Sequence, residues 1–145
     1  MPPPLPQPLP PAHGAVALAD DAIMAWPFRV VLGPELGSNL FILCGLVLSG
    51  LSFGALARSL QVDRVTAGAG AVWFSLTPFA LYEVTLGRPT QGLLVLLPLT
   101  LLYAHRVGRE SGWRNVLITG LVLGLTGYQY WYYLLFSALI CLALG

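Results

Sequence analysis

Long apolar runs separated by short polar segments dominate the chain after about residue 38. The first run covers residues 39–57 and contains no charged side chain. At about 1.5 Å per residue, a helix of this length spans roughly 28 Å, close to the roughly 30 Å hydrocarbon thickness of a bilayer. The pattern therefore predicts a membrane-spanning helix over residues 38–58.

Three further apolar segments follow, and each predicts more helix because lipid cannot satisfy the backbone of an open sheet. The last segment, residues 116–145, carries no charge and is too long for one upright helix. Gly124, Thr126 and Gly127 favour a break inside it. The predicted spans are therefore 65–86, 89–106, 114–128 and a partial span at 131–145.

The first 37 residues have a different pattern. Seven of the first eleven residues are Pro, which predicts an extended, disordered tail over residues 1–14. Residues 15–37 contain the Asp20–Asp21 pair followed by Trp26. This segment is typical of an extracytoplasmic loop with a helix lying at the membrane interface.

The composition agrees with a lipid environment. The chain is 57% hydrophobic and 9% charged, whereas a soluble domain has about 25% charged residues. All seven basic residues are Arg, and they are too scattered to predict a nucleic-acid surface. The predicted fold is an all-α polytopic transmembrane bundle of about four spans plus one interfacial helix.

The charges predict an orientation. Five of the seven arginines fall in loops on one side of the predicted bundle, and this side is cytoplasmic by the positive-inside tendency. The N-terminus is then outside with no leader or span before it, and the partial span at 131–145 is too short to cross a bilayer. Both ends predict truncation, so the chain is expected to be a piece of a longer protein. The five arginines on the predicted cytoplasmic side are Arg58, Arg64, Arg106, Arg109 and Arg114.

Cys44 and Cys141 lie inside apolar runs and are expected to pack as small hydrophobic side chains. No CxxC or Cys/His spacing predicts a metal site. The sequence predicts no cofactor and leaves a requirement for a divalent metal open.

Carboxylates on the predicted outer side are the first candidates for chemistry. Asp20 or Asp21 can cap the interfacial helix, or can act as a general base at the outer membrane surface. Glu83 and Arg88 flank the outer turn between two spans. They can form a structural ion pair or face water, or Glu83 can be an acid near the site while Arg88 binds a phosphate.

Five aromatic residues and one Gln form the segment 128–133, at the outer end of a predicted span. Such a cluster is typical of an aromatic belt at the interface. It also suits a sugar-binding wall, with Gln129, Tyr130 and Tyr132 as candidate substrate-binding residues. No role is predicted for His105.

The order of these features resembles a known class. Leu-Ala-Asp-Asp, Trp-Pro-Phe, Leu-Gly-Pro-x-x-x-x-Asn, Phe-Ser-x-x-Pro-Phe, Gly-Trp-Arg and Trp-Tyr-Tyr follow one another over about residues 15–145. The string resembles the early helices of bacterial polytopic membrane proteins of the GT-C glycosyltransferase class. That class includes protein O-mannosyltransferases and lipid A aminoarabinose transferases.

The resemblance implies a multi-pass protein of the bacterial inner (cell) membrane that transfers a sugar from a polyprenyl-phosphate carrier on the extracytoplasmic side. Its implied partners are membrane lipid and this sugar donor. It places catalytic carboxylates at Asp20, Asp21 and Glu83, and we expect Arg88 to hold the carrier phosphate. The first transmembrane helix of the class is absent, so this chain alone is expected to be inactive. The alternatives are a non-catalytic membrane component, such as a lipid or polysaccharide transporter or assembly subunit, and a degenerate reading frame.

Overall fold

A computed structural model describes residues 12–109 and 112–144, and side-chain surroundings for residues 22–109 and 112–142. Every regular element in the described part of the chain is an α-helix, as the apolar pattern predicts. In chain order the helices are α1 (Ala12–Leu32), α2 (Pro34–Ser59), α3 (Arg64–Ser75), α4 (Pro78–Thr85), α5 (Pro89–Gly92), α6 (Leu96–Arg109), α7 (Trp113–Gln129) and α8 (Trp131–Leu144).

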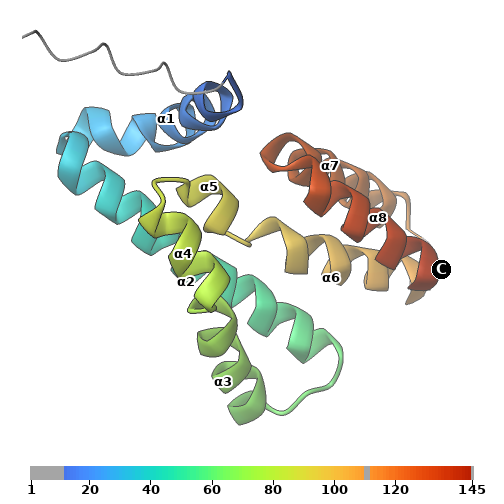
Figure 1. Ribbon diagram of the computed structural model, residues 1–145. Helices are drawn as coiled ribbons and strands as arrows, with labels where there is room; N and C mark the ends of the chain where they lie inside the picture. The colour runs from blue at the N-terminus through green and yellow to red at the C-terminus, as the bar shows by residue number, and fades with distance from the viewer. Residues whose placement is uncertain (1–11, 110–111, 145) are drawn as a thin grey trace, which may run out of the picture.

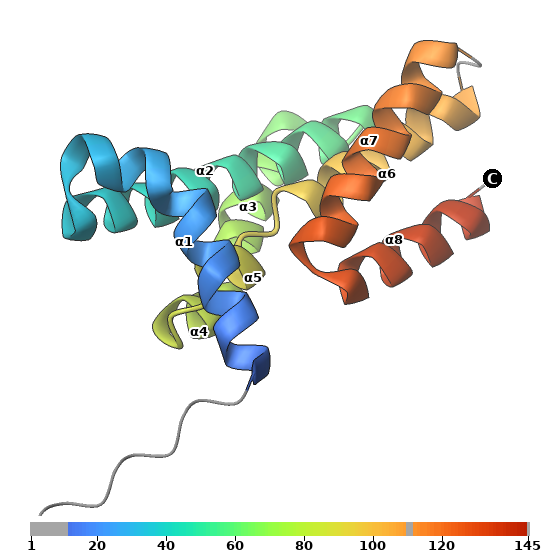
Figure 2. The same ribbon diagram turned by 90° about the horizontal axis from the view of Figure 1, so that it is seen from above.

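The helices form two groups that meet at α2, α5 and α6 (Figures 1 and 2). In the first group α2 packs against α1 on one side and against α3 on another. In the second group α6, α7 and α8 contact one another, and α6 also packs on α2. The short helix α5 contacts α4 and α1. Hydrogen bonds from Gln129 at the end of α7 and Tyr133 in α8 also reach the α5 region, so it connects the two groups.

Proline and one left-handed glycine fix several helix boundaries. Pro34, Pro78 and Pro89 each occupy the first turn of a helix, where the missing N–H has no intrahelical partner to lose. Gly33 has φ +84°, a conformation that glycine adopts without strain, and it reverses the chain between α1 and α2. The corners of the fold therefore follow from local sequence.

The structure refines the predicted boundaries at both ends of the chain. Helix α1 begins at Ala12, so residues 12–14 are helical although they belong to the predicted tail. Residues 1–11 lie outside the described part. Near the other end, the expected break falls at Tyr130, which has an extended backbone, and α8 restarts at Trp131 as predicted. Helix α7 runs through Gly127, and Leu134 of α8 packs onto that glycine.

Two helical segments are long and apolar enough to cross a membrane. They are Pro34–Ser59 and the nearly continuous Arg64–Thr85, which includes α3 and α4. In the most apolar 18 residues of each segment, only 28% and 17% of the residues are buried, respectively. Large side chains such as Trp73 (77% exposed) point outward. The core helices of a water-soluble protein are mostly buried, so this exposure favours lipid around both segments.

The helices at the later predicted spans lie close to the predicted positions but are shorter than an upright transmembrane helix. Residues 89–106 divide into the four-residue α5 and the 14-residue α6, and α7 and α8 have 17 and 14 residues. An upright transmembrane helix needs about 20 residues. The described helices therefore include two segments of spanning length, and a bundle of four spans is not established.

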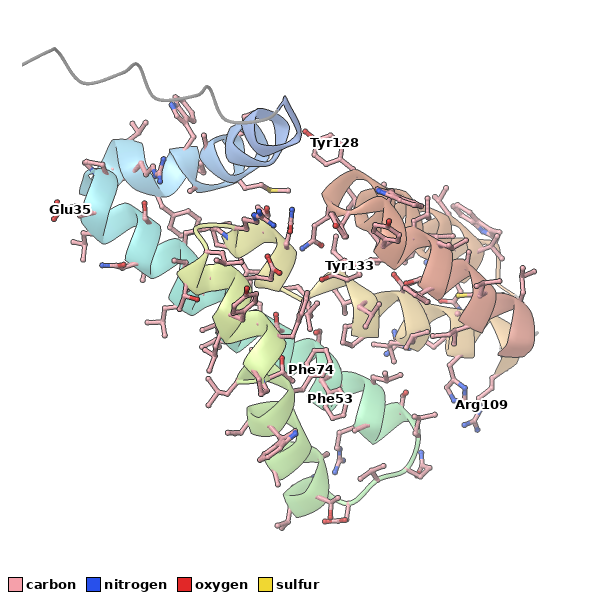
Figure 3. The ribbon with its side chains drawn as sticks, viewed as in Figure 1. Glu35, Phe53, Phe74, Arg109, Tyr128 and Tyr133 are labelled. Carbon is pink, nitrogen blue, oxygen red and sulfur yellow. The ribbon has the colours of Figure 1, made fainter. Side chains whose placement is uncertain are left out.

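Small residues let the helices pack closely, and α2 carries the spacing Gly50-x-x-x-Gly54, a pattern typical of close helix contacts. A Cβ added to Gly50 would lie 3.0 Å from the Ala71 carbonyl oxygen of α3. Farther along the same pair, the rings of Phe53 and Phe74 stack at a centroid distance of 4.8 Å (Figure 3). Between α6 and α7, the fully buried hydroxyls of Thr100 and Thr126 are 3.1 Å apart.

Asp63 caps α3 and makes stability depend on pH. Its carboxylate accepts hydrogen bonds from the N–H groups of Val65 and Thr66, both at 3.0 Å. Hydrogen bonds from the Thr66 side chain, then from its backbone, lower the pKa of Asp63 below its ordinary value of 3.8. A lowered pKa in the folded state means that the cap contributes stability above the unfolded-state pKa and loses it as the pH falls through the folded-state pKa.

We therefore expect Asp63→Asn to have a lower melting temperature than the unmodified chain in detergent at pH 7. This difference in melting temperature should become smaller as the pH falls towards 3. Thermal unfolding of both proteins by circular dichroism from pH 7 to pH 3 measures this difference. A difference in melting temperature that stays constant from pH 7 to pH 3 would contradict an ionised cap.

Candidate functional site

The short helix α5 is held by side chains from the end of α7 and the start of α8. Gln129 Nε2 donates hydrogen bonds to the carbonyl oxygens of Thr90 and Leu93, the second at 2.7 Å. The Tyr133 hydroxyl donates to the Gln91 carbonyl oxygen at 2.7 Å, and Figure 3 shows its ring directed from α8 towards α5. Three hydrogen bonds thus join segments that are 36 to 42 residues apart.

Glu83 of α4 belongs to the same cluster. Helix α4 approaches α5 closely at Gly92, where an added Cβ would lie 2.7 Å from the Ala80 carbonyl oxygen and 3.3 Å from Glu83 Cβ. The Glu83 carboxylate is within electrostatic reach of the Tyr133 hydroxyl. Its Oε2 atom is buried and has no hydrogen-bond partner among the described residues. An acid with an unused buried oxygen therefore sits beside the polar groups that hold α5.

Arg88 does not pair with Glu83 through its side chain. The Arg88 guanidinium is exposed and makes no ion pair with Glu83, and the link between the two residues is a 2.9 Å hydrogen bond from Arg88 N–H to the Glu83 carbonyl oxygen. Gly87, with φ +74°, makes the tight turn that allows this bond. The ion-pair interpretation of the two residues is therefore wrong, and Arg88 faces outward.

An apolar cavity of about 260 Å³ lies next to the cluster. We name it the apolar cavity; α1, α2, the α5–α6 connection and Gln129 line it, and Gln129 is one of its few polar residues. Aromatic and sulphur-containing side chains make up much of the wall. They include Met24, Phe28, Phe41 and Cys44. Cys44 and Cys141 are both free thiols, in agreement with packing as small apolar residues.

A second cavity of about 270 Å³ lies on another side of α1, between α1, α2 and the α4–α5 turn. We name it the arginine cavity because Arg29 lines it, together with Gly87 and Pro89. Arg29 Nε donates to Ser38 Oγ at 2.8 Å, and Ser38 Oγ donates to the Pro34 carbonyl oxygen at 2.6 Å. This chain orients the guanidinium and leaves its two terminal nitrogens available to a ligand.

Asp20 and Asp21 lie within α1, but their side chains are outside the described part of the structure. The helix begins at Ala12, so neither residue is at its N-terminus, and the capping interpretation is wrong. Ala22, which follows Asp21 directly, lines the arginine cavity with Gly87. In the backbone, Asp21 is therefore adjacent to a residue that lines this cavity.

The aromatic segment divides into structural and exposed members. The Tyr130 ring lies 5.5 Å from that of Tyr132 and 5.3 Å from that of Tyr133, while Tyr132 stacks on Trp131 at 3.7 Å. Tyr132 and Trp131 are exposed, whereas Tyr130 is half-buried. Gln129 uses its amide nitrogen on two backbone carbonyls, so only its Oε1 remains to accept a hydrogen bond from a ligand.

The sequence interpretation missed Arg29 and Tyr133. Arg29 follows Trp-Pro-Phe in the sequence, and its basic charge on the predicted outer side was the available signal. Tyr133 is four residues after Gln129, but the break at Tyr130 separates the two into different helices. The partners of both residues come from distant segments, which no local pattern specifies.

Among residues 22–109 and 112–142, no group of three or more His, Cys, Asp or Glu side chains comes together in a form that could hold a metal ion. No known protein family matches the chain, and neither curated proteins nor solved structures give a match. Its functional interpretation therefore depends on the geometry around α5.

Proposed function

We propose that this chain serves a membrane-embedded glycosyl transfer in which the sugar donor is carried on a polyprenyl phosphate at the extracytoplasmic side. The observation that carries the proposal is the convergence around α5 of an acid with a buried unused oxygen, an oriented arginine and an apolar cavity. These three features suit the three parts of such a reaction: a hydroxyl to be deprotonated, a phosphate and a hydrocarbon chain. The protein is then a multi-pass component of a bacterial inner membrane.

In this proposal Arg29 binds the carrier phosphate through its two terminal nitrogens, and the exposed Arg88 adds a second positive charge near the turn. A guanidinium matches the oxygens of a phosphate with two parallel hydrogen bonds, and this geometry suits Arg better than Lys. The apolar cavity receives the isoprenoid units next to the phosphate. The exposed Tyr132 and the half-buried Tyr130 offer ring faces to the sugar.

The chemical step balances without a redox partner. A carboxylate from Glu83, Asp20 or Asp21 accepts the proton of the acceptor hydroxyl as its oxygen bonds to the anomeric carbon. The bond between that carbon and the carrier oxygen breaks, and its electron pair leaves on the phosphate. Arg29 and Arg88 stabilise the negative charge that develops there.

The test uses the full chain in lipid nanodiscs with a photoreactive polyprenyl-phosphate sugar. We expect labelling that phosphorylated polyprenol suppresses and unphosphorylated polyprenol does not. Arg29→Gln should weaken labelling about tenfold, because it removes a charge-assisted contact. Glu83→Gln and the Asp20→Asn/Asp21→Asn double variant should both retain labelling, and the one that removes the base should lower any sugar transfer to an acceptor about 100-fold.

Two matched variants keep the comparison specific. Arg114→Gln removes an arginine that lies over the Trp113 ring, outside both cavities, and Glu35→Gln removes an exposed carboxylate. Both should behave like the unmodified chain. Equal competition by phosphorylated and unphosphorylated polyprenol, or unchanged labelling of Arg29→Gln, would contradict donor binding.

One observation favours a second candidate, a non-catalytic membrane component such as a lipid or polysaccharide transporter or an assembly subunit. Gln129 and Tyr133 already donate their hydrogens to the backbone of α5, so they act as structural ties. In that case donor labelling persists, whereas Glu83→Gln and the Asp20→Asn/Asp21→Asn double variant leave any sugar transfer unchanged.

A further inference from the structure

A groove of about 380 Å³ separates α2 from α3 near the loop that joins them. Its volume is in the range of small-molecule sites in proteins, about 300–1,000 Å³. Both helices belong to the two segments that are long enough to cross a membrane. The groove is therefore positioned along candidate membrane-spanning helices, where lipid is the surrounding solvent.

Three glycines show how the space between the two helices changes along the groove. At Gly50 they touch, since an added Cβ would lie 3.0 Å from the Ala71 carbonyl oxygen. At Gly54 the nearest neighbour is the Ala71 Cβ at 3.6 Å, and at Gly68 nothing lies within 4 Å. The groove thus opens towards the α2–α3 loop, and its walls are small apolar residues that leave room for a hydrocarbon chain.

Two arginines stand at the open end of the groove. Arg58 near the end of α2 and Arg64 at the start of α3 both line it, both are exposed, and neither forms an ion pair among the described residues. Asp63, the acid next to Arg64, directs its carboxylate to the N–H groups of Val65 and Thr66. Two positive charges are therefore left for a ligand at the mouth of an apolar slot.

We infer that this groove binds one anionic phospholipid, with an acyl chain along Gly54 and Gly68 and the phosphate between Arg58 and Arg64. The occupant follows from charge complementarity. A net-neutral lipid such as phosphatidylcholine carries a choline cation that offsets its phosphate, whereas an anionic headgroup offers both guanidinium groups a phosphate with no cation beside it. The inference requires only that α2 and α3 lie in a bilayer, and it is independent of the glycosyl transfer proposed above.

The test measures retention of phosphatidylglycerol against phosphatidylcholine by native mass spectrometry of the full chain released from mixed nanodiscs. Each arginine near an anionic headgroup contributes about a fivefold preference. Arg58→Gln and Arg64→Gln should therefore each weaken phosphatidylglycerol retention about fivefold, and together about 25-fold. The matched control is the double variant Arg106→Gln/Arg109→Gln, which removes two arginines outside the groove and should change retention less than twofold.

A steric variant tests the apolar part of the site. Gly68 lines the groove, and an added Cβ there meets nothing within 4 Å. Gly68→Leu should therefore keep the helical circular dichroism and lose phosphatidylglycerol retention. Gly124→Leu is its control, because an added Cβ there also meets nothing within 4 Å and lies on α7, away from the groove.

Three results of the retention measurements would overturn the inference. They are equal retention of phosphatidylcholine and phosphatidylglycerol, unchanged retention in the Arg58→Gln/Arg64→Gln variant, and unchanged retention in Gly68→Leu. Competition by glycerol phosphate as strong as that by the lipid would also overturn it, since the site would then bind free phosphate without the acyl chain.

Discussion

Gly37→Ala is expected to destabilise the protein by about 3 kcal/mol, because the added methyl group meets backbone atoms that cannot move aside. Gly37 is buried in the first turns of α2, directly against the end of α1. An added Cβ would lie 2.5 Å from the Phe28 carbonyl oxygen, 2.6 Å from the Phe28 carbonyl carbon and 2.7 Å from Arg29 Cα. Helix α1 must therefore shift away from α2 or unfold.

The consequences should reach both cavities. Phe28 lines the apolar cavity and Arg29 lines the arginine cavity, so movement of α1 displaces a wall of each. Chemical denaturation in detergent, followed by circular dichroism, measures the change in the free energy of unfolding. The photolabelling experiment should show a parallel loss of donor binding.

Gly120→Ala provides the matched control for this substitution. Gly120 is also within a helix, but an added Cβ meets nothing within 4 Å. Alanine is favoured over glycine by about 1 kcal/mol inside a helix, so this variant should be slightly more stable than the unmodified chain. Equal stability of Gly37→Ala and Gly120→Ala would show that α1 does not pack against α2 as described.

The second large effect is expected for Gln129→Leu, which should lower the free energy of unfolding by about 2 kcal/mol. The leucine is similar in size but cannot donate to the carbonyl oxygens of Thr90 and Leu93. A buried hydrogen bond contributes about 1 kcal/mol, and two are lost at once. The end of α7 then loses its hold on α5, and the apolar cavity opens at the wall that Gln129 forms.

Two tyrosine variants distinguish the loss of hydrogen bonds to α5 from general effects of substitution. Tyr133→Phe removes the single hydrogen bond to Gln91 and should cost about 1 kcal/mol. Tyr128→Phe removes a hydroxyl from a side chain that is 62% exposed and should have no measurable effect. The same denaturation assay compares the three variants, and a Gln129→Leu protein as stable as Tyr128→Phe would contradict the tie.

The candidate site depends on contacts that the sequence alone does not predict. Glu83 and Gln129 were identified from residue type and from their place at the predicted outer ends of spans. Their common position around α5 was not predicted, because the hydrogen bonds that join α5 to α7 and α8 connect residues 36 to 42 positions apart. The side-chain role of Gln129 as a donor to backbone, and the outward direction of Arg88, depend on those distant contacts.

The apolar runs by themselves determined that this chain is helical, since their length and low charge favour helix over any structure with open backbone groups in lipid. Pro34, Pro78 and Pro89 determined where several helices begin, because proline is favoured in a first turn and disfavoured further in. These are local effects. Helices such as α2 and α8 are apolar on all sides, so no contrast between faces specifies which neighbour they contact.

Only the tertiary structure decided that α5 is the meeting point of both helix groups, that Arg29 faces a cavity, and that α2 and α3 part at Gly68. The groove between α2 and α3 gives the reason: an added Cβ at Gly50 would lie 3.0 Å from the Ala71 carbonyl oxygen, whereas one at Gly68 meets nothing within 4 Å. The sequence shows a glycine at both positions in the same way. The difference lies in which residue of another helix stands opposite, and this is set by packing across the whole fold.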